Sequence, residues 1–215
     1  MDNRTKEAIR YLGYGRQEAD EQTLGLVADA FRELDETAKP RSIYRTFELQ
    51  WKQTDTIRIE MMEIHSRNLS KNLKGCRQVV LLCGTLGIEV DYLIKRYSYT
   101  EMAKAVVMQA CAAALLEEYL DERQEEIRIE MEKQDLYLRP RFSPGYGDFS
   151  ILHQREILTL MEASKKIGLT MTESSMLTPT KSVTALIGLS KTQENCHQKG
   201  CEVCGKKDCI YRRES

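Results

Sequence analysis

The chain has 215 residues, enough for one sizeable core or for one domain with a small appendage. Its 41% hydrophobic and 30% charged residues exclude an intrinsically disordered chain, and its formal net charge of −1 argues against nucleic acid as a partner. The polar N-terminus, MDNRTKEAIR, lacks the apolar run of a signal peptide, and the longest apolar stretches are too short to span a membrane. We therefore expect a cytoplasmic protein without a membrane partner.

The first part of the chain alternates between helical and extended patterns. Asp20 is a plausible N-cap for apolar residues that recur at helical spacing, and Pro40 closes the helix that they predict. The run RQVVLLCGT is almost continuously apolar, which predicts a strand buried on both faces. The predicted elements are a helix over residues 20–36, strands over 42–51 and 56–64, a short helix over 66–73, the buried strand over 77–85 and a helix from Gly87.

Residues 100–133 contain neither proline nor glycine, which predicts one helix about 50 Å long. Its second half, DERQEEIRIEMEKQ, is mostly charged and predicts a face turned to solvent or to a partner. Its first half carries a predicted buried stripe of Met102, Val106, Ala110, Ala113, Leu116 and Leu120.

The last third begins with a loop, RPRFSPGYGDFS, that its prolines and glycines fix. A helix is predicted over residues 150–167 with Gly168 as its C-cap, and strand-like pieces at 169–174 and 182–189 flank a Thr178–Pro179 turn. Helices and strands do not strictly alternate. This order predicts an α+β fold with a mainly antiparallel twisted sheet, flanking helices and one long helix.

The seven cysteines fall into two groups. Cys76, Cys83 and Cys111 lie in apolar segments and are expected in the core, because free cysteine is among the most buried residue types. The other four crowd the end of the chain in a C-x4-C-x2-C-x4-C pattern, which predicts a metal site. These ligands are Cys196, Cys201, Cys204 and Cys209. The pattern suits zinc or an iron–sulfur cluster, and we divide the chain into a domain over 1–190 and a metal-binding tail over 191–215.

Three motifs follow one another in the last third: RPRFSPGYGD at 139–148, IGLTMTES at 167–174 and PTKSVTALIG at 179–188. An Arg-x-x-Pro-Gly-Tyr loop, a helix, a Thr-Glu-Ser strand and a Ser-Val strand after a proline turn resemble the C-terminal half of the activation domain of cobalamin-dependent methionine synthase. EYLDER at 118–123 is similar to part of the long helix before that loop, and TLGIEVD at 85–91 suits stand-alone members.

The resemblance implies that the domain binds S-adenosylmethionine, lies over cobalamin and allows cob(II)alamin to be reduced and remethylated. Carried over by motif, Arg141, Gly145 and Tyr146 would contact S-adenosylmethionine, and Ser143 would offer backbone contacts. Glu173 has two interpretations, a ligand-site carboxylate or a strand-end carboxylate bonded to its hydroxyl neighbours. By motif position, Lys181 and Ser182 would line the same cleft. Ala114 falls near a position where the family has an acidic ligand-site residue.

The chemistry of the loop agrees with this implication. A guanidinium matches a carboxylate in a bidentate fork, so Arg141 suits the carboxylate of the ligand. The ring of Tyr146 can face a sulfonium or stack on adenine, and Gly145 allows close backbone approach. The alternative is a tight Pro-Gly turn in which Arg141 is only a surface ion-pair partner.

No histidine of the chain lies in an Asp-x-His-x-x-Gly loop of the kind that ligates cobalt in cobalamin modules. We therefore expect an accessory reactivation factor that acts in trans on a corrinoid protein or a cobalamin-dependent methyltransferase, with an electron-donor protein as a possible further partner. Since reactivation consumes an electron, we lean slightly to iron–sulfur in the tail. The alternative function is a zinc-ribbon adaptor without a small-molecule site. An independent methyltransferase is disfavoured, because no Gly-rich strand–helix turn lies near the N-terminus.

Overall fold

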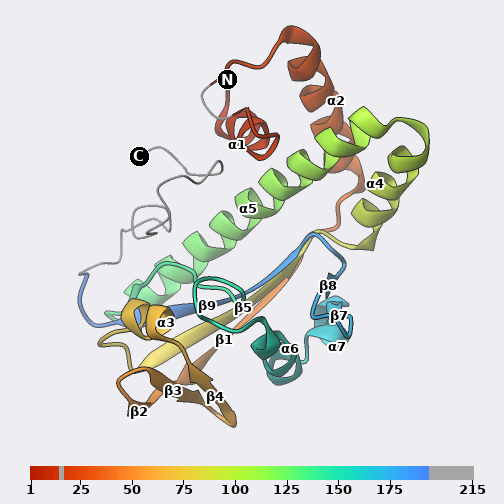
Figure 1. Ribbon diagram of the computed structural model, residues 1–215. Helices are drawn as coiled ribbons and strands as arrows, with labels where there is room; N and C mark the ends of the chain where they lie inside the picture. The colour runs from red at the N-terminus through yellow and green to blue at the C-terminus, as the bar shows by residue number, and fades with distance from the viewer. Residues whose placement is uncertain (15–16, 194–215) are drawn as a thin grey trace.

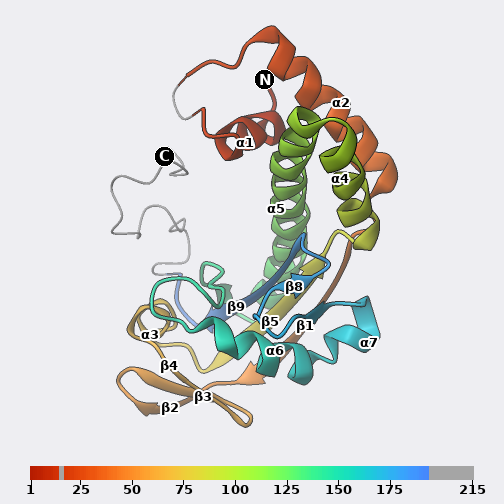
Figure 2. The same cartoon turned by 45° about the vertical axis from the view of Figure 1, so that its right-hand side comes forward.

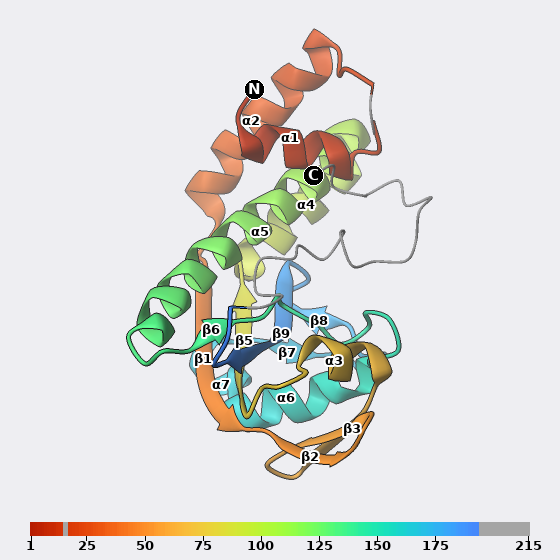
Figure 3. The same ribbon diagram turned by 90° about the vertical axis from the view of Figure 1, so that its left-hand side faces the viewer.

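The computed structural model describes residues 1–14 and 17–193, so the four tail cysteines and the metal site predicted for them lie outside the described residues. Four of the helices gather on one side of the molecule (Figure 1). They are α1 (Asn3–Tyr11), α2 (Glu21–Thr37), α4 (Ile88–Thr100) and α5 (Met102–Glu132). One end of α5 packs among α1, α2 and α4, and the other end crosses the central sheet (Figure 3).

The central sheet is antiparallel, in the order β1 (Arg41–Glu48), β5 (Gln78–Thr85), β9 (Ser182–Ser190) and β6 (Tyr137–Leu138). Both long neighbours pair with β5 along its whole length, and every residue of β5 after Gln78 is buried. The strand predicted to be buried on both faces is therefore confirmed.

The other face of the sheet is covered by short elements (Figure 2). They are α3 (Arg67–Asn72), η1 (Ile151–His153), α6 (Gln154–Met161), α7 (Ala163–Ile167) and two small sheets. One small sheet contains β2 (Gln50–Gln53), β3 (Thr56–Ile59) and β4 (Met62–His65), and the other pairs β7 (Thr170–Met171) with β8 (Leu177–Thr178).

The two faces of the sheet enclose separate apolar cores. The core between the sheet and α5, here called the α5 core, contains Val80, Leu82 and Ile187. The core between the sheet and α3 and α6, here called the α3–α6 core, contains Val79 and Leu81. The opposite burial of adjacent β5 residues follows from the two-residue period of a strand. The predicted core cysteines are also confirmed, since Cys111 belongs to the first core and Cys76 and Cys83 to the second. Burial raises the pKa of the Cys83 thiol and of the Cys111 thiol to about 12.

Several local predictions are confirmed. The Asp20 side chain accepts a hydrogen bond from the backbone N–H of Thr23 at 2.7 Å, which caps α2. Gly168 ends α7 in the left-handed conformation with φ of 69°. The single long helix is present as α5, and helices combine with antiparallel sheets, so the α+β class is confirmed.

Three element predictions are wrong in their bounds. The strand expected over 56–64 is a hairpin, because Glu60 turns the chain with φ of 51°. The strand expected over 42–51 ends at Glu48, and the chain then enters a different sheet as β2. The helix expected over 150–167 is broken into η1, α6 and α7, and Glu162 adopts a left-handed conformation at the second break.

The predicted buried stripe of α5 is partly wrong. Met102 and Val106 are 64% and 54% exposed, although Leu116 and Leu120 are buried as expected. The first half instead buries a neighbouring face, through Ala105, Val107, Met108, Cys111 and Ala112. Val106 therefore lies on an exposed face of α5 among the described residues.

Among the described residues, no helix is both long enough and apolar enough to cross a bilayer.

Candidate functional site

The loop that carries the Arg-x-x-Pro-Gly-Tyr motif starts as an extension of the sheet edge. The backbone N–H of Arg139 donates to Gly188 O at 2.8 Å, and Phe142 exchanges two hydrogen bonds with Leu186 of β9. The Phe142 side chain packs against the α3–α6 core. Neighbouring residues of an extended segment point to opposite faces, and Arg141 accordingly contacts α5.

Asp148 anchors the far end of this loop to α3. Its carboxylate accepts hydrogen bonds from Ser66 Oγ at 2.5 Å, from Arg67 N at 2.8 Å and from Asn68 N at 3.1 Å. The pKa of Asp148 is lowered from its ordinary value, and the hydrogen bond from Ser66 makes the largest contribution. Next to it, Phe149 is buried and fixes the end of the loop in the core. Both ends of the loop are thus held by long-range contacts.

The turn between these anchors has the geometry that its sequence predicts. Gly145 has φ of 93°, in the region that favours glycine, and its N–H donates to Phe149 O at 2.8 Å. Tyr146 N donates to Ser143 O at 3.1 Å. The Tyr146 side chain is 66% exposed, with its ring edge-on to Phe142 at a centroid distance of 6.5 Å. The turn therefore presents the Tyr146 ring and a glycine backbone at the surface.

Arg141 is held by two carboxylates of α5. Its Nη2 donates to Glu117 Oε2 at 2.9 Å and to Asp121 Oδ1 at 2.7 Å, and its side chain is only 16% exposed. Its Nη1 is buried without a hydrogen-bond partner among the described residues. The guanidinium is thus fixed in position, and one of its nitrogens still has donor capacity.

Lys181 precedes β9 and reaches the same helix. Its Nζ donates to the backbone oxygen of Gln109 at 3.1 Å, and burial lowers its pKa although the charge of Asp91 acts in the other direction. It borders a groove of about 300 Å³ between α1 and α5. The other lining residues are Tyr11, Leu12, Val106, Gln109, Ala110 and Ala113.

Glu173 lies in the turn between β7 and β8, and its side chain is exposed. The hydroxyls of Thr172 and Ser174 bond to each other at 2.9 Å, and no hydrogen bond from either to the Glu173 carboxylate is observed in this turn. Gln154 Nε2 donates to Ser175 O at 3.2 Å, which ties the turn to the start of α6. Glu173 therefore belongs to the α6 side of the sheet, whereas Arg141 contacts α5.

Two further positions from the motif comparison have structural roles. Ser182 Oγ lies 2.6 Å from Pro179 O and 2.8 Å from Thr85 Oγ1, so its hydroxyl joins the start of β9 to the end of β5. Ala114 is buried in the α5 core. A side chain at this position therefore points into the core and not toward the groove.

Sequence reasoning missed Glu117, Asp121 and Gln109. A signal was present, because Glu117 and Asp121 are spaced i, i+4 on a predicted helix and so project from one face. The arginine that they hold is 24 and 20 residues further along the chain, and only the fold brings these groups together.

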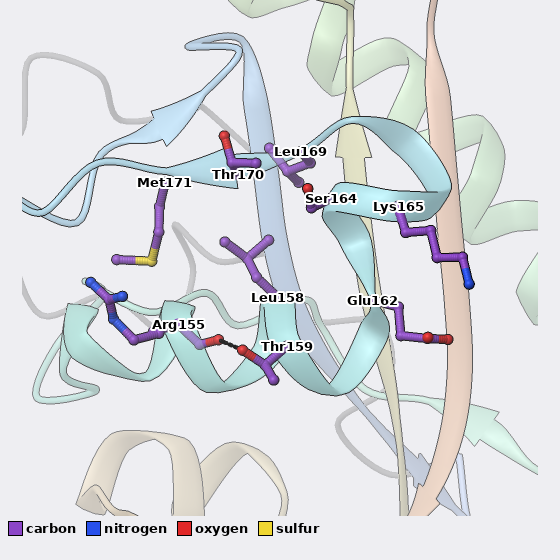
Figure 4. A pocket seen from close by; sticks show the side chains of 9 residues that line it. All are labelled: Arg155, Leu158, Thr159, Glu162, Ser164, Lys165, Leu169, Thr170 and Met171. Carbon is purple, nitrogen blue, oxygen red and sulfur yellow. Dashed lines mark hydrogen bonds between the residues drawn. The ribbon is translucent and has the colours of Figure 1, made fainter.

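A second groove, of about 390 Å³, lies on the other face of the sheet between α6, α7 and β7 (Figure 4). Arg155, Glu162 and Lys165 line it, and all three are exposed. None of the site residues predicted from the motifs lines this groove. Within residues 1–14 and 17–193, no group of three or more His, Cys, Asp or Glu side chains could hold a metal ion.

Comparison with known proteins connects this geometry to a family. No curated protein matches the sequence. The chain is similar in structure to a crystal structure of the MetH reactivation domain bound to AdoHcy, with a TM-score of 0.61 and 17% sequence identity over 86% of this chain and 75% of that one. At this identity the likeness concerns the fold. The family model described as vitamin B12-dependent methionine synthase, activation domain, matches residues 70–198, more than half of the sequence. The chain therefore belongs to the activation-domain family of vitamin B12-dependent methionine synthase.

Proposed function

We propose that this protein binds S-adenosylmethionine along α5 and supports, in trans, the reductive remethylation of cob(II)alamin on a corrinoid protein or cobalamin-dependent methyltransferase. The observation that carries the proposal is the fixed Arg141 guanidinium, held by Glu117 and Asp121 inside the matched region. The related reactivation domain is described as bound to AdoHcy, a ligand of the same chemical class, which supports the choice of ligand.

The amino-acid end of S-adenosylmethionine carries a carboxylate beside two cationic groups, an ammonium and a sulfonium. Arg141 has a buried Nη1 with donor capacity for the carboxylate. Glu117 and Asp121 provide negative charge for the cations on the same helix face. In this proposal Glu117, one turn beyond Ala114, supplies the acidic group that the buried alanine cannot.

The loop completes the proposed contacts. Gly145 lets the ligand approach the backbone, Ser143 offers its backbone groups, and the exposed Tyr146 ring provides a face for the sulfonium or for adenine. Glu173, on the α6 side of the central sheet, remains a candidate ligand-site carboxylate in this proposal. A Glu173→Gln variant in the titration described below tests it, since a ligand-site carboxylate would lower affinity when neutralised and a turn carboxylate would not.

For the trans role, we propose that a corrinoid protein supplies the cobalamin, since none of the histidines within these 215 residues lies in a cobalt-ligating loop motif. We propose an accessory component rather than a complete catalyst, acting in the cytoplasm with a corrinoid partner. Co-purification from native extract, followed by mass spectrometry, tests this role. Recovery of a corrinoid protein or cobalamin-dependent methyltransferase supports it, and a chain that retains neither contradicts it.

For the tail, we propose that Cys196, Cys201, Cys204 and Cys209 bind an iron–sulfur cluster that receives an electron from a donor protein, with zinc as the alternative. Four thiolates suit either metal. Anaerobic purification with visible absorption and metal analysis decides between them. Stoichiometric zinc without a visible charge-transfer band would end the electron-relay proposal and leave a structural zinc site.

Calorimetric titration with S-adenosylmethionine tests ligand binding. We expect saturable binding by the full chain and a loss of about 10- to 100-fold in affinity for Arg141→Met, since a hydrogen-bonded charge contributes about 1.5–3 kcal/mol. Arg155→Met, in the α6–α7 groove, is the matched control and should bind like the unaltered chain. The absence of binding would favour the zinc-ribbon adaptor instead, as would equal affinity of the unaltered chain and Arg141→Met.

A further inference from the structure

The last described strand, β9, ends beside the charged half of α5. Its final residue, Ser190, pairs with Tyr137 of β6, and β6 packs against the end of α5. An extended chain covers at most about 3.6 Å per residue, so Cys196 lies within about 22 Å of Ser190. At 1.5 Å per residue, α5 is about 46 Å long. The first tail cysteine can therefore reach the charged half of α5 but little of its first half.

A stripe of glutamates runs along the exposed face of this half. Its members follow one another at intervals of three or four residues, so they share one face of the helix. They are Glu118, Glu122, Glu125 and Glu132, with Ile129 between the last two, and all are exposed. Ile129 is 48% exposed, so an apolar side chain interrupts an otherwise charged face. We call these five residues the α5 stripe.

The negative charge of the α5 stripe is only partly compensated. Two of its four glutamates share a single cation, Arg128. Within residues 1–14 and 17–193, Glu122 forms no ion pair. Partial burial raises the pKa of Glu118, and the negative charge of Glu122 acts in the same direction, although Arg4 opposes both. An excess of negative charge therefore faces solvent within reach of the tail.

The tail carries the opposite charge. Residues 206–213, which lie outside the described residues, read KKDCIYRR and contain four cations and one acid. Their two lysines stand between the third and fourth tail cysteines. Opposite charges attract at short range, and Ile210 and Tyr211 supply apolar side chains that can cover Ile129. Starting point, length and charge thus agree on one occupant for the α5 stripe.

We propose that residues 194–215 fold back on the α5 stripe, so that the metal predicted for the tail lies on the side of the sheet that carries Arg141. The inference rests on the proposed function for the presence of that metal and for the ligand at Arg141. In this arrangement the metal and the ligand share one face of the molecule, as an electron relay requires. The charged half of α5 then faces a segment of its own chain and not only solvent.

Zero-length cross-linking of the full chain tests the contact, because a carbodiimide joins a lysine amine only to a carboxylate that touches it. We expect mass spectrometry to find Lys206 or Lys207 joined to Glu118 or Glu122 within one chain. A mixture of unlabelled and isotope-labelled chains separates links within a chain from links between chains. The proposal is overturned if these links are absent, if they join only carboxylates outside the stripe, or if they form only between chains.

Neutral variants of the full chain provide a second readout. The double variant Glu118→Gln with Glu122→Gln should let trypsin cleave after the tail cations about threefold faster, a small factor because exposed ion pairs are weak. Glu21→Gln with Glu36→Gln removes two exposed charges of α2 and is the matched control. Equal cleavage rates for the two double variants contradict the proposal. Glu122→Gln alone breaks no described ion pair, and it keeps the test decisive if thermal melting shows that the double variant does not fold.

Titration with S-adenosylmethionine separates this inference from the proposed function. The tail contact does not involve Arg141, so Glu118→Gln with Glu122→Gln should keep the affinity for S-adenosylmethionine within twofold. A chain that forms the cross-links but does not bind S-adenosylmethionine contradicts the proposed function and leaves the tail contact standing. A chain that binds S-adenosylmethionine without forming the cross-links does the reverse.

Discussion

The two grooves lie on opposite faces of the central sheet and differ in how their charges are held. The α6–α7 groove is the larger, at about 390 Å³ against about 300 Å³. Yet its charged side chains are exposed, and Glu162 pairs with Lys166 only one turn away. On the α5 side, Lys181, which precedes β9 and borders the groove between α1 and α5, and Arg141, which lies in the motif loop, both reach across to α5. The proposed function accordingly places the ligand beside the partly buried charges that distant elements fix, and not in the larger groove.

Charge reversal should produce the largest difference between the Arg141 site on α5 and the α6–α7 groove. Glu117→Lys places an ammonium against the Arg141 guanidinium, which the carboxylate now holds at 2.9 Å. We expect the affinity for S-adenosylmethionine to fall about 100-fold, or about 2.7 kcal/mol, because the ligand cations lose their counter-charge and meet a positive one. Calorimetric titration measures this loss.

The control for this charge reversal is Glu162→Lys, which makes the same change in the α6–α7 groove. Its pair with Lys166 is exposed, so we expect ligand affinity to stay within twofold of the unaltered chain. Equal losses for the two variants would show that net charge, rather than the Arg141 site on α5, governs binding.

The anchor of the motif loop should produce the next largest effect. Asp148→Ala removes the acceptor for Ser66 Oγ and for two backbone N–H groups at the start of α3. Loss of a helix cap costs about 1–2 kcal/mol of unfolding free energy, which urea denaturation measures. A loosened loop should also reduce ligand affinity several-fold.

Asp55→Ala is the control for this anchor, because the Asp55 carboxylate pairs at 3.4 Å with the exposed side chain of Arg67, also at the start of α3. We expect a change in unfolding free energy below about 1 kcal/mol and no change in ligand affinity. If Asp148→Ala destabilised the protein without weakening the ligand, the loop would not depend on this anchor for its binding geometry.

Features with a local cause could be predicted from the sequence. The continuous apolar run predicted β5, and the Pro-Gly pair predicted the turn at Gly145. Both predictions succeed because strand burial and a positive φ depend on residues close together in the chain. The hairpin at Glu60 was missed because a non-glycine residue takes the positive φ that its turn requires.

Features that depend on tertiary packing could not be predicted. Periodicity in α5 allowed two adjacent apolar faces, and contact with α1, α2 and α4 decides that Met108 is buried while Val106 is exposed. The same limit applies to the site. The motif identified Arg141, but the docking of the loop on α5 supplies Glu117 and Asp121.

The smallest effect should come from a charged cluster that lies outside both grooves. Lys104 Nζ of α5 donates to Glu33 of α2 at 2.6 Å, and Tyr97 OH of α4 donates to the same carboxylate at 2.6 Å. We expect Glu33→Gln to lower the unfolding free energy by about 1 kcal/mol, because these groups are only partly buried. Asp29→Asn, which breaks an exposed pair with Arg32 on α2, is the control and should change it less.

The pH dependence of this effect identifies its cause. Burial opposes ionisation of Glu33, but the hydrogen bonds from Lys104 and Tyr97 outweigh it and hold the pKa of Glu33 below its ordinary value. The carboxylate therefore binds protons less readily in the folded chain than in the unfolded one, whose glutamate pKa is about 4.3. Its contribution is complete well above that pH and is lost as the pH falls through the folded pKa. The difference between the unaltered chain and Glu33→Gln in urea denaturation should accordingly vanish in acid, and a difference that persists there would point to packing. Ligand affinity at neutral pH should be unchanged, since charge contacts that only join helices stabilise the fold without forming a site.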